Sequence, residues 1–254
     1  MTDTLIAEPR GNVLLMTINR PPVRNAIDGA TARALFAALE LLDSSPELSI
    51  GVLTGAGGNF SAGMDLKAFL SGDTPEIPGR GLGGLTQQPP RKPMIAAVEG
   101  WALAGGFEMV LACDLVVAGQ SAKFGVPEVK RSLVAAGGAA LRLPERVGLT
   151  VAMELLLTGD PVGAARAESI GLVNRVVPDG TAVEEGLALA AVIAANGPLA
   201  LAATKQVALC ARDWSSGQRW ERQREIVAPV FDSQDAREGA AAFTEKRPPK
   251  WKGR

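Results

Sequence analysis

Two glutamates in apolar surroundings are the candidate reactive groups of this chain. Glu108 stands between Phe107 and Met109, and Glu128 follows Pro127. A carboxylate in an apolar setting is unfavourable unless it is paired or has a function. Two carboxylates in one pocket can hold a water molecule and divide acid and base roles between them. A solvated or salt-bridged side chain also explains each glutamate taken singly, so the residues alone leave both interpretations open.

The backbone amides of Met64 and Gly105 form a second candidate group. We expect each residue to begin a helix after a glycine-rich turn. The first N–H groups of a helix have no partner within the helix and lie at the positive end of its dipole. Two such amides converging on one point would form an oxyanion hole for a carbonyl oxygen that gains charge. The alternative for Gly105 is a buried helix that carries a single solvated glutamate.

Two similar units of the chain position these groups. A short buried strand at 50–54 leads into a glycine-rich loop at 55–59 and a short helix from about 60–66. A second strand at 94–98 leads to the Gly105–Gly106 pair and a helix with Glu108 in its first turn. Repeated strand–loop–helix units favour stacked ββα turns over a doubly wound sheet.

The remaining elements complete an α/β core and a helical tail. Strands are expected at 5–7, 13–18, 115–118 and 172–177, and a helix at 29–43 with Asp28 as its N-cap. Residues 71–93 hold five prolines and five glycines and predict a long irregular loop that decides substrate choice. Further helices are expected at 139–147, 150–157, 164–169, 181–196, 199–213, 216–230 and 233–245. We therefore expect a core over 1–195 and a helical oligomerisation region over 196–254.

The composition excludes several classes of function. The 254 residues include no histidine and no tyrosine, so Ser-His-Asp catalysis and histidine metal sites are impossible. The net charge of −1 and the lack of a basic stripe argue against nucleic acid as a partner. The apolar run at 187–195 is about half a membrane span. Cys113 and Cys210 suggest buried free thiols, and the N-terminus has no secretory signal, so we expect a cytoplasmic protein without a metal site.

These motifs together resemble the crotonase (enoyl-CoA hydratase/isomerase) superfamily along nearly the whole chain. Seven segments carry the resemblance in order: 19–26, 53–66, 96–108, 112–115, 124–129, 171–174 and 243–247. The resemblance implies a crotonase-type ββα spiral core with a C-terminal helical trimerisation region. It also implies a homotrimer or a dimer of trimers.

The resemblance further implies reversible addition of water to a 2-enoyl-CoA. Met64 and Gly105 match the backbone donors that bind the thioester oxygen in that family. Glu108 and Glu128 match its two catalytic glutamates, and we assign Glu108 to water activation and Glu128 to the α-proton. No separate cofactor is expected, because coenzyme A is part of the thioester substrate.

The same resemblance assigns the residues that bind the substrate. Coenzyme A is expected along Arg24, Ala26, Ala62, Asp65 and Leu66, mostly through backbone groups, with Lys246 and Phe243 supplied by a neighbouring subunit. The acyl pocket is expected to include Leu66, Phe69, Leu70, Leu85, Trp101, Leu133 and Ala136, although ordinary core packing explains each of these equally well.

Two departures from the family pattern put a standard short-chain substrate in question. Arg131 adds a charge near the pocket, and Ala136 replaces a glycine whose N–H helps to hold water. Parts of the sequence are also similar to the carnitinyl-CoA dehydratase branch. The alternatives are therefore a carnitinyl-CoA dehydratase-like enzyme, an isomerase that uses one glutamate, an acyl-CoA hydrolase, and a non-catalytic acyl-CoA-binding protein.

Overall fold

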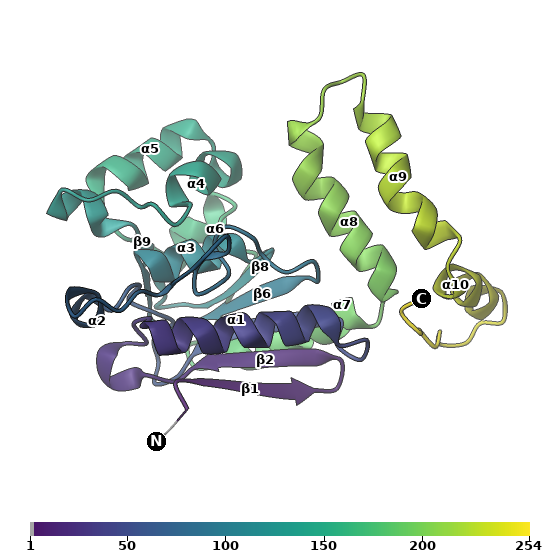
Figure 1. Ribbon diagram of the computed structural model, residues 1–254, viewed down its shortest axis with the longest axis horizontal. Helices are drawn as coiled ribbons and strands as arrows, with labels where there is room; N and C mark the ends of the chain where they lie inside the picture. Colours follow the sequence, from purple (N-terminus) through teal and green to yellow (C-terminus); the bar gives the residue numbers. More distant parts are fainter. Residues whose placement is uncertain (1–2) are drawn as a thin grey trace.

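A six-stranded sheet forms the centre of the molecule (Figure 1). The computed structural model describes residues 3–254. The strands lie in the order β1-β2-β3-β6-β8-β11. Their bounds are Leu5–Arg10, Val13–Ile18, Ile50–Gly55, Met94–Val98, Leu115–Gly119 and Arg175–Val177. β1 pairs antiparallel with β2, and every other neighbouring pair is parallel.

A smaller sheet runs beside the first and contains β7 (Trp101–Leu103), β9 (Lys123–Gly125) and β10 (Val162–Gly163). Isolated parallel bridges, Ser61 with Ala102 and Ile27 with Met64, pair further segments in the same manner. A strand of the large sheet is thus followed by a short extended segment and then by a helix, as in β6–β7–α3. The predicted ββα arrangement is confirmed.

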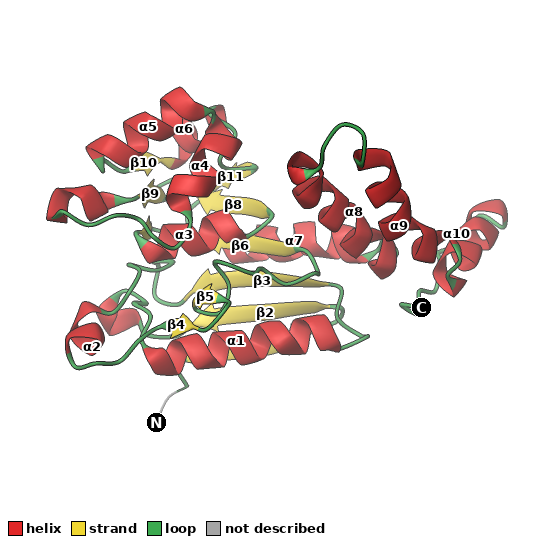
Figure 2. Ribbon diagram, turned by 45° about the horizontal axis from the view of Figure 1, so that its top comes forward, coloured by secondary structure: helices red, strands yellow, loops and turns green. Residues whose placement is uncertain are grey.

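Helices cover both faces of the large sheet, which explains why its parallel strands are almost continuous apolar runs (Figure 2). α1 (Gly29–Ser44) buries Leu35, Leu39 and Leu42 against one face, and its N-cap Asp28 accepts a hydrogen bond from Thr31 N at 2.8 Å. On the other face α7 (Ala182–Ala194) packs across β3, β6 and β8 through small residues.

The remaining elements of the core surround the smaller sheet. The helices are α2 (Leu66–Leu70), α3 (Gly105–Ala112), α4 (Ala139–Val147), α5 (Leu149–Thr158) and α6 (Ala164–Ser169). Two 3₁₀ turns, η1 (Pro21–Val23) and η2 (Pro127–Arg131), and a short hairpin of β4 (Glu76–Ile77) and β5 (Gly81–Leu82) complete the core.

The C-terminal helices extend to one side of the core (Figure 1). They are α8 (Pro198–Cys210), the 3₁₀ turn η3 (Ala211–Asp213), α9 (Arg219–Phe231) and α10 (Gln234–Thr244). Lys205 Nζ joins α8 to the core through Asp114 Oδ2 at 2.7 Å, and Trp251 Nε1 donates to Ala195 O at 2.8 Å. α7 ends at Ala194 and α8 begins at Pro198; both the expected division of the chain at 195/196 and a role in trimerisation stay predictions.

Two expectations about secondary structure and one about cysteine burial are corrected. The strand predicted at 172–177 covers only Arg175–Val177, because the amides of Leu172 and Val173 bond to Ala167 O and continue the turn after α6. Residues 71–93 contain the short β4–β5 hairpin within the predicted loop. Cys113 is buried, whereas Cys210 is only half-buried; neither forms a disulfide.

Within residues 3–254, none of the helices has both the length and the apolarity to cross a membrane by itself. One adjacent pair, 182–194 with 198–213, passes the same test when taken together, but is bent by 104°.

Candidate active site

The amides of Met64 and Gly105 lie side by side. A β-carbon built on Gly105 would be 3.6 Å from Met64 N, and one built on Gly63 would be 2.8 Å from Gly105 N. Within residues 3–254 neither amide donates a hydrogen bond to another group of the protein. Unsatisfied N–H groups in a half-buried position are unfavourable without a partner, so the pair is suited to an external oxygen acceptor.

Met64 is not at the start of a helix, which corrects the prediction. α2 begins at Leu66, and Asp65 is its N-cap, accepting from Lys67 N at 3.1 Å and Ala68 N at 3.2 Å. The Met64 amide is directed instead by the parallel bridge to Ile27. Ile27 N donates to Gly63 O, and Asp65 N donates to Ile27 O. Successive residues of an extended segment point their N–H groups to opposite sides, so the Met64 amide points away from Ile27.

Gly105 is the first residue of α3, as predicted, and the chain before it is strained. Ala104 has φ 50° and ψ −129°, a conformation that disfavours a residue with a β-carbon. Gly106 packs so closely on Ser61 that a β-carbon there would be 2.8 Å from the Ser61 carbonyl carbon. These contacts hold the first turn of α3 against the segment that contains Met64.

Glu108 projects from the first turn of α3 into a buried position. Its side chain is 4% exposed, and Oε1 accepts a hydrogen bond from Ala139 N at 3.1 Å. Burial raises its pKa, and the charges of Glu128 and Glu76 raise it further, whereas the amides of Ala139 and Gly137 act in the opposite direction. The carboxyl is therefore held by backbone donors but retains a proton more readily than an ordinary glutamate.

Glu128 lies in η2 and is half-buried. Within the described chain its buried Oε2 has no hydrogen-bond partner. Burial raises its pKa, and the charge of Arg131 counteracts this effect. The negative charge of Glu128 is one of the causes that raise the pKa of Glu108.

The segments predicted to bind coenzyme A lie next to one another. Ala62 N donates to Arg24 O at 2.9 Å, which places 24–27 beside 62–65. The Asp65 carboxylate pairs with Arg20 at 3.0 Å, and Arg20 also donates to the carbonyl of Ala26. The Asp65 side chain is thus engaged within the protein, which leaves backbone groups and the exposed Arg24 to face a ligand.

Comparison with known proteins decides the family. The family model for enoyl-CoA hydratase/isomerase matches residues 8–254. The chain is 42% identical to an enoyl-CoA hydratase of Mycobacterium tuberculosis, with 98% of this chain and 96% of the relative covered. It is 39% identical to a carnitinyl-CoA dehydratase of Salmonella typhi over the full length of both. The crystal structure of an enoyl-CoA hydratase from Mycobacterium marinum is 53% identical and superimposes with a TM-score of 0.97, covering 99% of this chain and all of that one.

The chain belongs to the enoyl-CoA hydratase/isomerase family. The crotonase-type α/β fold predicted from the sequence is confirmed by these matches.

The residues predicted to line the acyl pocket of this hydratase/isomerase family member are found in different settings. Leu66, Phe69 and Leu70 are exposed on α2, and Leu133 and Ala136 are exposed between η2 and α4. Leu85 is fully buried in the main core and has no surface to offer a ligand. Trp101 lies at the far end of β7 from Gly105, where Lys123 Nζ is 5.1 Å from its ring centroid.

The alanine at 136 is compatible with its backbone. Ala136 is not among the residues with a positive φ, so its methyl group adds no backbone strain. Its N–H donates no hydrogen bond within residues 3–254. The glycine that the site requires is the next one, Gly137, because a β-carbon there would overlap the carboxylate of Glu108.

Residues 71–93 form a fixed roof over the start of α3, which the sequence did not predict. Leu82 packs its side chain against Gly105, and Glu76 is paired directly opposite Leu82 in the β4–β5 hairpin. Directly paired residues of an antiparallel ladder project to the same face, so Glu76 also faces the site. The bonds that anchor this roof include Gly29 N to Asp73 at 2.7 Å, Arg80 to Glu40 at 2.7 Å, and Arg142 to Thr86 O at 2.6 Å.

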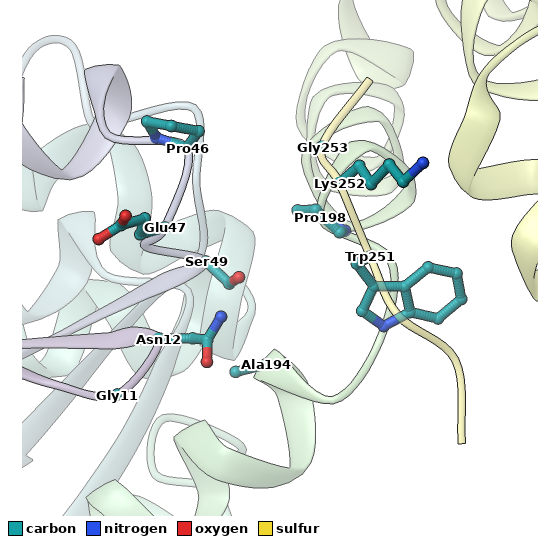
Figure 3. A pocket seen from close by; sticks show the side chains of 10 residues that line it. All are labelled: Gly11, Asn12, Pro46, Glu47, Ser49, Ala194, Pro198, Trp251, Lys252 and Gly253. Atoms are coloured by element: carbon teal, nitrogen blue, oxygen red, sulfur yellow. The ribbon is translucent and has the colours of Figure 1, made fainter. Parts of the chain in front are cut away.

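A groove of about 410 Å³ lies elsewhere, between the core and the C-terminal tail (Figure 3). Asn12, Glu47 and Ser49 line it on the core side, and Trp251 and Lys252 on the side of the tail. None of its lining residues belongs to the site around Glu108. Lys246 and Phe243 are exposed on and after α10, on the side of the molecule away from α2 (Figure 1). In the described part of the chain, no three His, Cys, Asp or Glu residues cluster as a metal site.

Proposed function

We propose that this protein is an enoyl-CoA hydratase-like lyase that adds water reversibly to a 2-enoyl-CoA. The observation that carries the proposal is the placement of two unpaired amides, Met64 and Gly105, at the helix whose first turn bears Glu108, with Glu128 in electrostatic reach. An oxyanion hole beside two carboxyls is what addition of water to a conjugated thioester requires. The names of the full-length relatives support the same reaction.

In the proposed reaction the thioester oxygen accepts hydrogen bonds from Met64 N–H and Gly105 N–H. The water oxygen bonds to the β-carbon, the double-bond electrons move toward the thioester oxygen, and Glu108 takes the proton that water loses. Glu128 then donates a proton to the α-carbon as the enolate returns to a thioester. The substrate gains one hydroxyl and one hydrogen, and proton exchange with water restores both glutamates.

The division of roles follows the family resemblance, because burial raises the pKa of both carboxyls. For Glu108 the bond from the Ala139 amide acts against burial and favours the ionised form that a base needs. Glu128 has a buried oxygen without a partner among the described residues, and burial favours its protonated form, as an acid needs. Coenzyme A enters as part of the substrate, so the reaction as written uses no separate cofactor.

The proposal includes an assembly and a location. Trp220 and Phe231 on α9 and Phe243 on α10 are exposed large apolar residues, which supports burial of this region against other subunits in a trimer or a dimer of trimers. Lys246 would then reach coenzyme A bound to a neighbour. The two free thiols are consistent with a cytoplasmic location. Sedimentation of the purified protein tests the assembly.

A carnitinyl-CoA dehydratase-like activity is the second candidate. It uses the same groups in the reverse direction, and the full-length relatives of that name favour it, together with Arg131 and Ala136 near the pocket. The substrate panel should therefore include carnitinyl-CoA and its dehydrated product beside simple enoyl-CoAs.

The test measures the loss of the conjugated enoyl-thioester absorbance over a panel of substrates, which runs from crotonyl-CoA to long-chain and branched enoyl-CoAs. Glu108→Gln and Glu128→Gln should each lower turnover by about 10²- to 10⁴-fold. The control Glu154→Gln changes an exposed glutamate on α5 and should leave turnover unaltered.

The alternatives give different results. An isomerase would keep substantial activity without one of the two glutamates, and a hydrolase would release free coenzyme A. Tight acyl-CoA binding without turnover of any substrate would indicate a non-catalytic binder and reject the lyase.

A further inference from the structure

Arg142 on α4 is a half-buried cation without a carboxylate at ion-pair distance within residues 3–254. Burial lowers its pKa. A buried charge is unfavourable unless its environment compensates for the lost water. The contacts of the guanidinium therefore indicate what the residue is for.

Its first contact is with the roof. Arg142 Nη2 donates to Thr86 O at 2.6 Å, and Thr86 Oγ1 accepts from Leu82 N at 3.0 Å. Leu82 in turn packs on Gly105, whose amide is one half of the proposed oxyanion hole. Three consecutive contacts thus connect Arg142 to that amide.

Its second contact is with the loop that holds Glu108. Gly138 has φ 116° and lies so close to Arg142 Nη1 that a β-carbon would overlap it. Gly138 stands between Gly137 and Ala139, the two residues whose amides favour the charged form of Glu108. Arg142 therefore packs against the segment whose amides hold the Glu108 carboxylate.

We propose that Arg142 is a positioning residue that couples the two halves of the site. One guanidinium holds 82–86 and 137–139 in a fixed relation, and so keeps the oxyanion amide and the Glu108 carboxylate at the separation the reaction needs. The inference rests on the proposed function, since it gives Arg142 its role through Glu108 and Gly105.

Other charges around Arg142 define the control. Arg146, Glu145 and Arg212 are the further charged groups that influence it. Arg146 lies one turn later on the same helix and is also half-buried, but it donates to the carbonyls of Leu111 and Cys113 at the far end of α3. A substitution of Arg146 therefore tests the general effect of removing a buried arginine from α4.

The experiment compares Arg142→Met, Arg142→Lys and Arg146→Met by the pH profile of kcat, by kcat and KM separately, and by amide hydrogen exchange. We expect Arg142→Met to lower kcat about 10- to 100-fold with little change in KM, because a displaced catalytic group loses activity of this order. The acid limb of its profile should move to higher pH, since the Gly137 and Ala139 amides that favour ionised Glu108 lose their fixed position. Arg142→Lys should keep the acid limb near that of the wild type.

Hydrogen exchange separates this inference from the proposed function. Arg142→Met should accelerate exchange in both 81–88 and 136–140, whereas Arg146→Met should not accelerate it in both. A wild type inactive on every enoyl-CoA would defeat the proposed function, yet the exchange result would still test the coupling. An Arg142→Met enzyme with an unmoved acid limb, or with exchange unchanged in either segment, would overturn the role of Arg142.

Discussion

The carboxylate of Glu108 lies directly against the backbone of Gly137. A β-carbon on Gly137 would be 2.8 Å from Glu108 Cδ and would overlap Oε2. Only a glycine at this position lets the carboxyl rest on the loop that supplies the Ala139 amide. The close contact between the Glu108 carboxylate and the Gly137 backbone thus determines the position of the proposed catalytic base.

Gly137→Ala should displace Glu108 without strain of its own, because Gly137 does not have a positive φ. A shift of about 1 Å in a catalytic group lowers turnover by about 10²-fold. Steady-state kinetics should show this loss in kcat, with coenzyme A binding retained. Gly163→Ala is the control, since no atom lies within 4 Å of a β-carbon there. Equal activity of the two variants would contradict the contact.

The acid limb of the pH profile of kcat should depend on the charge of Glu76. Burial, Glu128 and Glu76 all raise the pKa of Glu108, so the base is lost at a higher pH than for an ordinary glutamate. Glu76→Gln removes one negative charge, lowers the pKa of Glu108, and should move the acid limb of kcat to lower pH. Added salt should weaken the difference, because Glu76 is exposed. A limb that does not move would show that Glu76 does not act on Glu108.

Ala104→Gly should stabilise the fold and weaken catalysis. The left-handed backbone at Ala104 costs about 1–3 kcal/mol in a residue with a β-carbon. Glycine relieves that strain but loses about 0.5–1 kcal/mol of chain entropy, which leaves a gain of about 1 kcal/mol. Chemical denaturation measures the gain, and a lower kcat would report a looser Gly105 amide.

The matched control is Ala140→Gly on the exposed side of α4, where no strain exists to relieve. It should destabilise the protein by up to about 1 kcal/mol. A loss of stability in both variants would mean that the Ala104 backbone is not strained.

Local geometry explains what the sequence could predict of the site. Gly105 and Glu108 lie within one helical turn, so a predicted helix start fixes both. Met64 shows the limit of this reasoning, because the helix after it begins two residues later. Asp65, a favourable N-cap, was the signal that marked the true start.

Contacts between distant segments explain what the sequence could not predict. Arg142 contacts Thr86, and Gly137 contacts Glu108, across roughly 30–60 positions in the chain. The hydrophobic periodicity of a sequence does not predict pairs so far apart. The proximity of Glu128 to Glu108 was likewise available only from the family resemblance. Leu85 is fully buried in the core, and its place in the acyl pocket stays a prediction, since an apolar residue near a site is as well suited to the core.

The C-terminal tail should loosen when Glu238 is neutralised. Arg247 and the Lys250 amide bond to Glu238 and hold its pKa at about 2. A carboxyl with a depressed pKa stabilises the fold above its ordinary value of 4.5, and this contribution is lost as the pH falls toward about 2. Glu238→Gln should produce the loosened tail already at neutral pH.

Hydrogen exchange at 247–254 measures this effect. Exchange should be faster in Glu238→Gln than in the wild type at pH 7, while 50–55 in the central sheet stays protected in both. Unchanged protection of the tail would show that Trp251 and its bond to Ala195 hold the segment without the ion pair.

The roof formed by residues 71–93 bears on which step of the catalytic cycle limits turnover. Bonds from Asp73, Arg80 and Thr86 to α1 and α4 hold this cover in place, so we expect that neither entry of substrate nor departure of product waits for it to open. Turnover should then respond to deuterated water more than to solvent viscosity. A change in acyl preference should then come from new side chains beneath the roof, because bonds to α1 and α4 hold the roof itself in place.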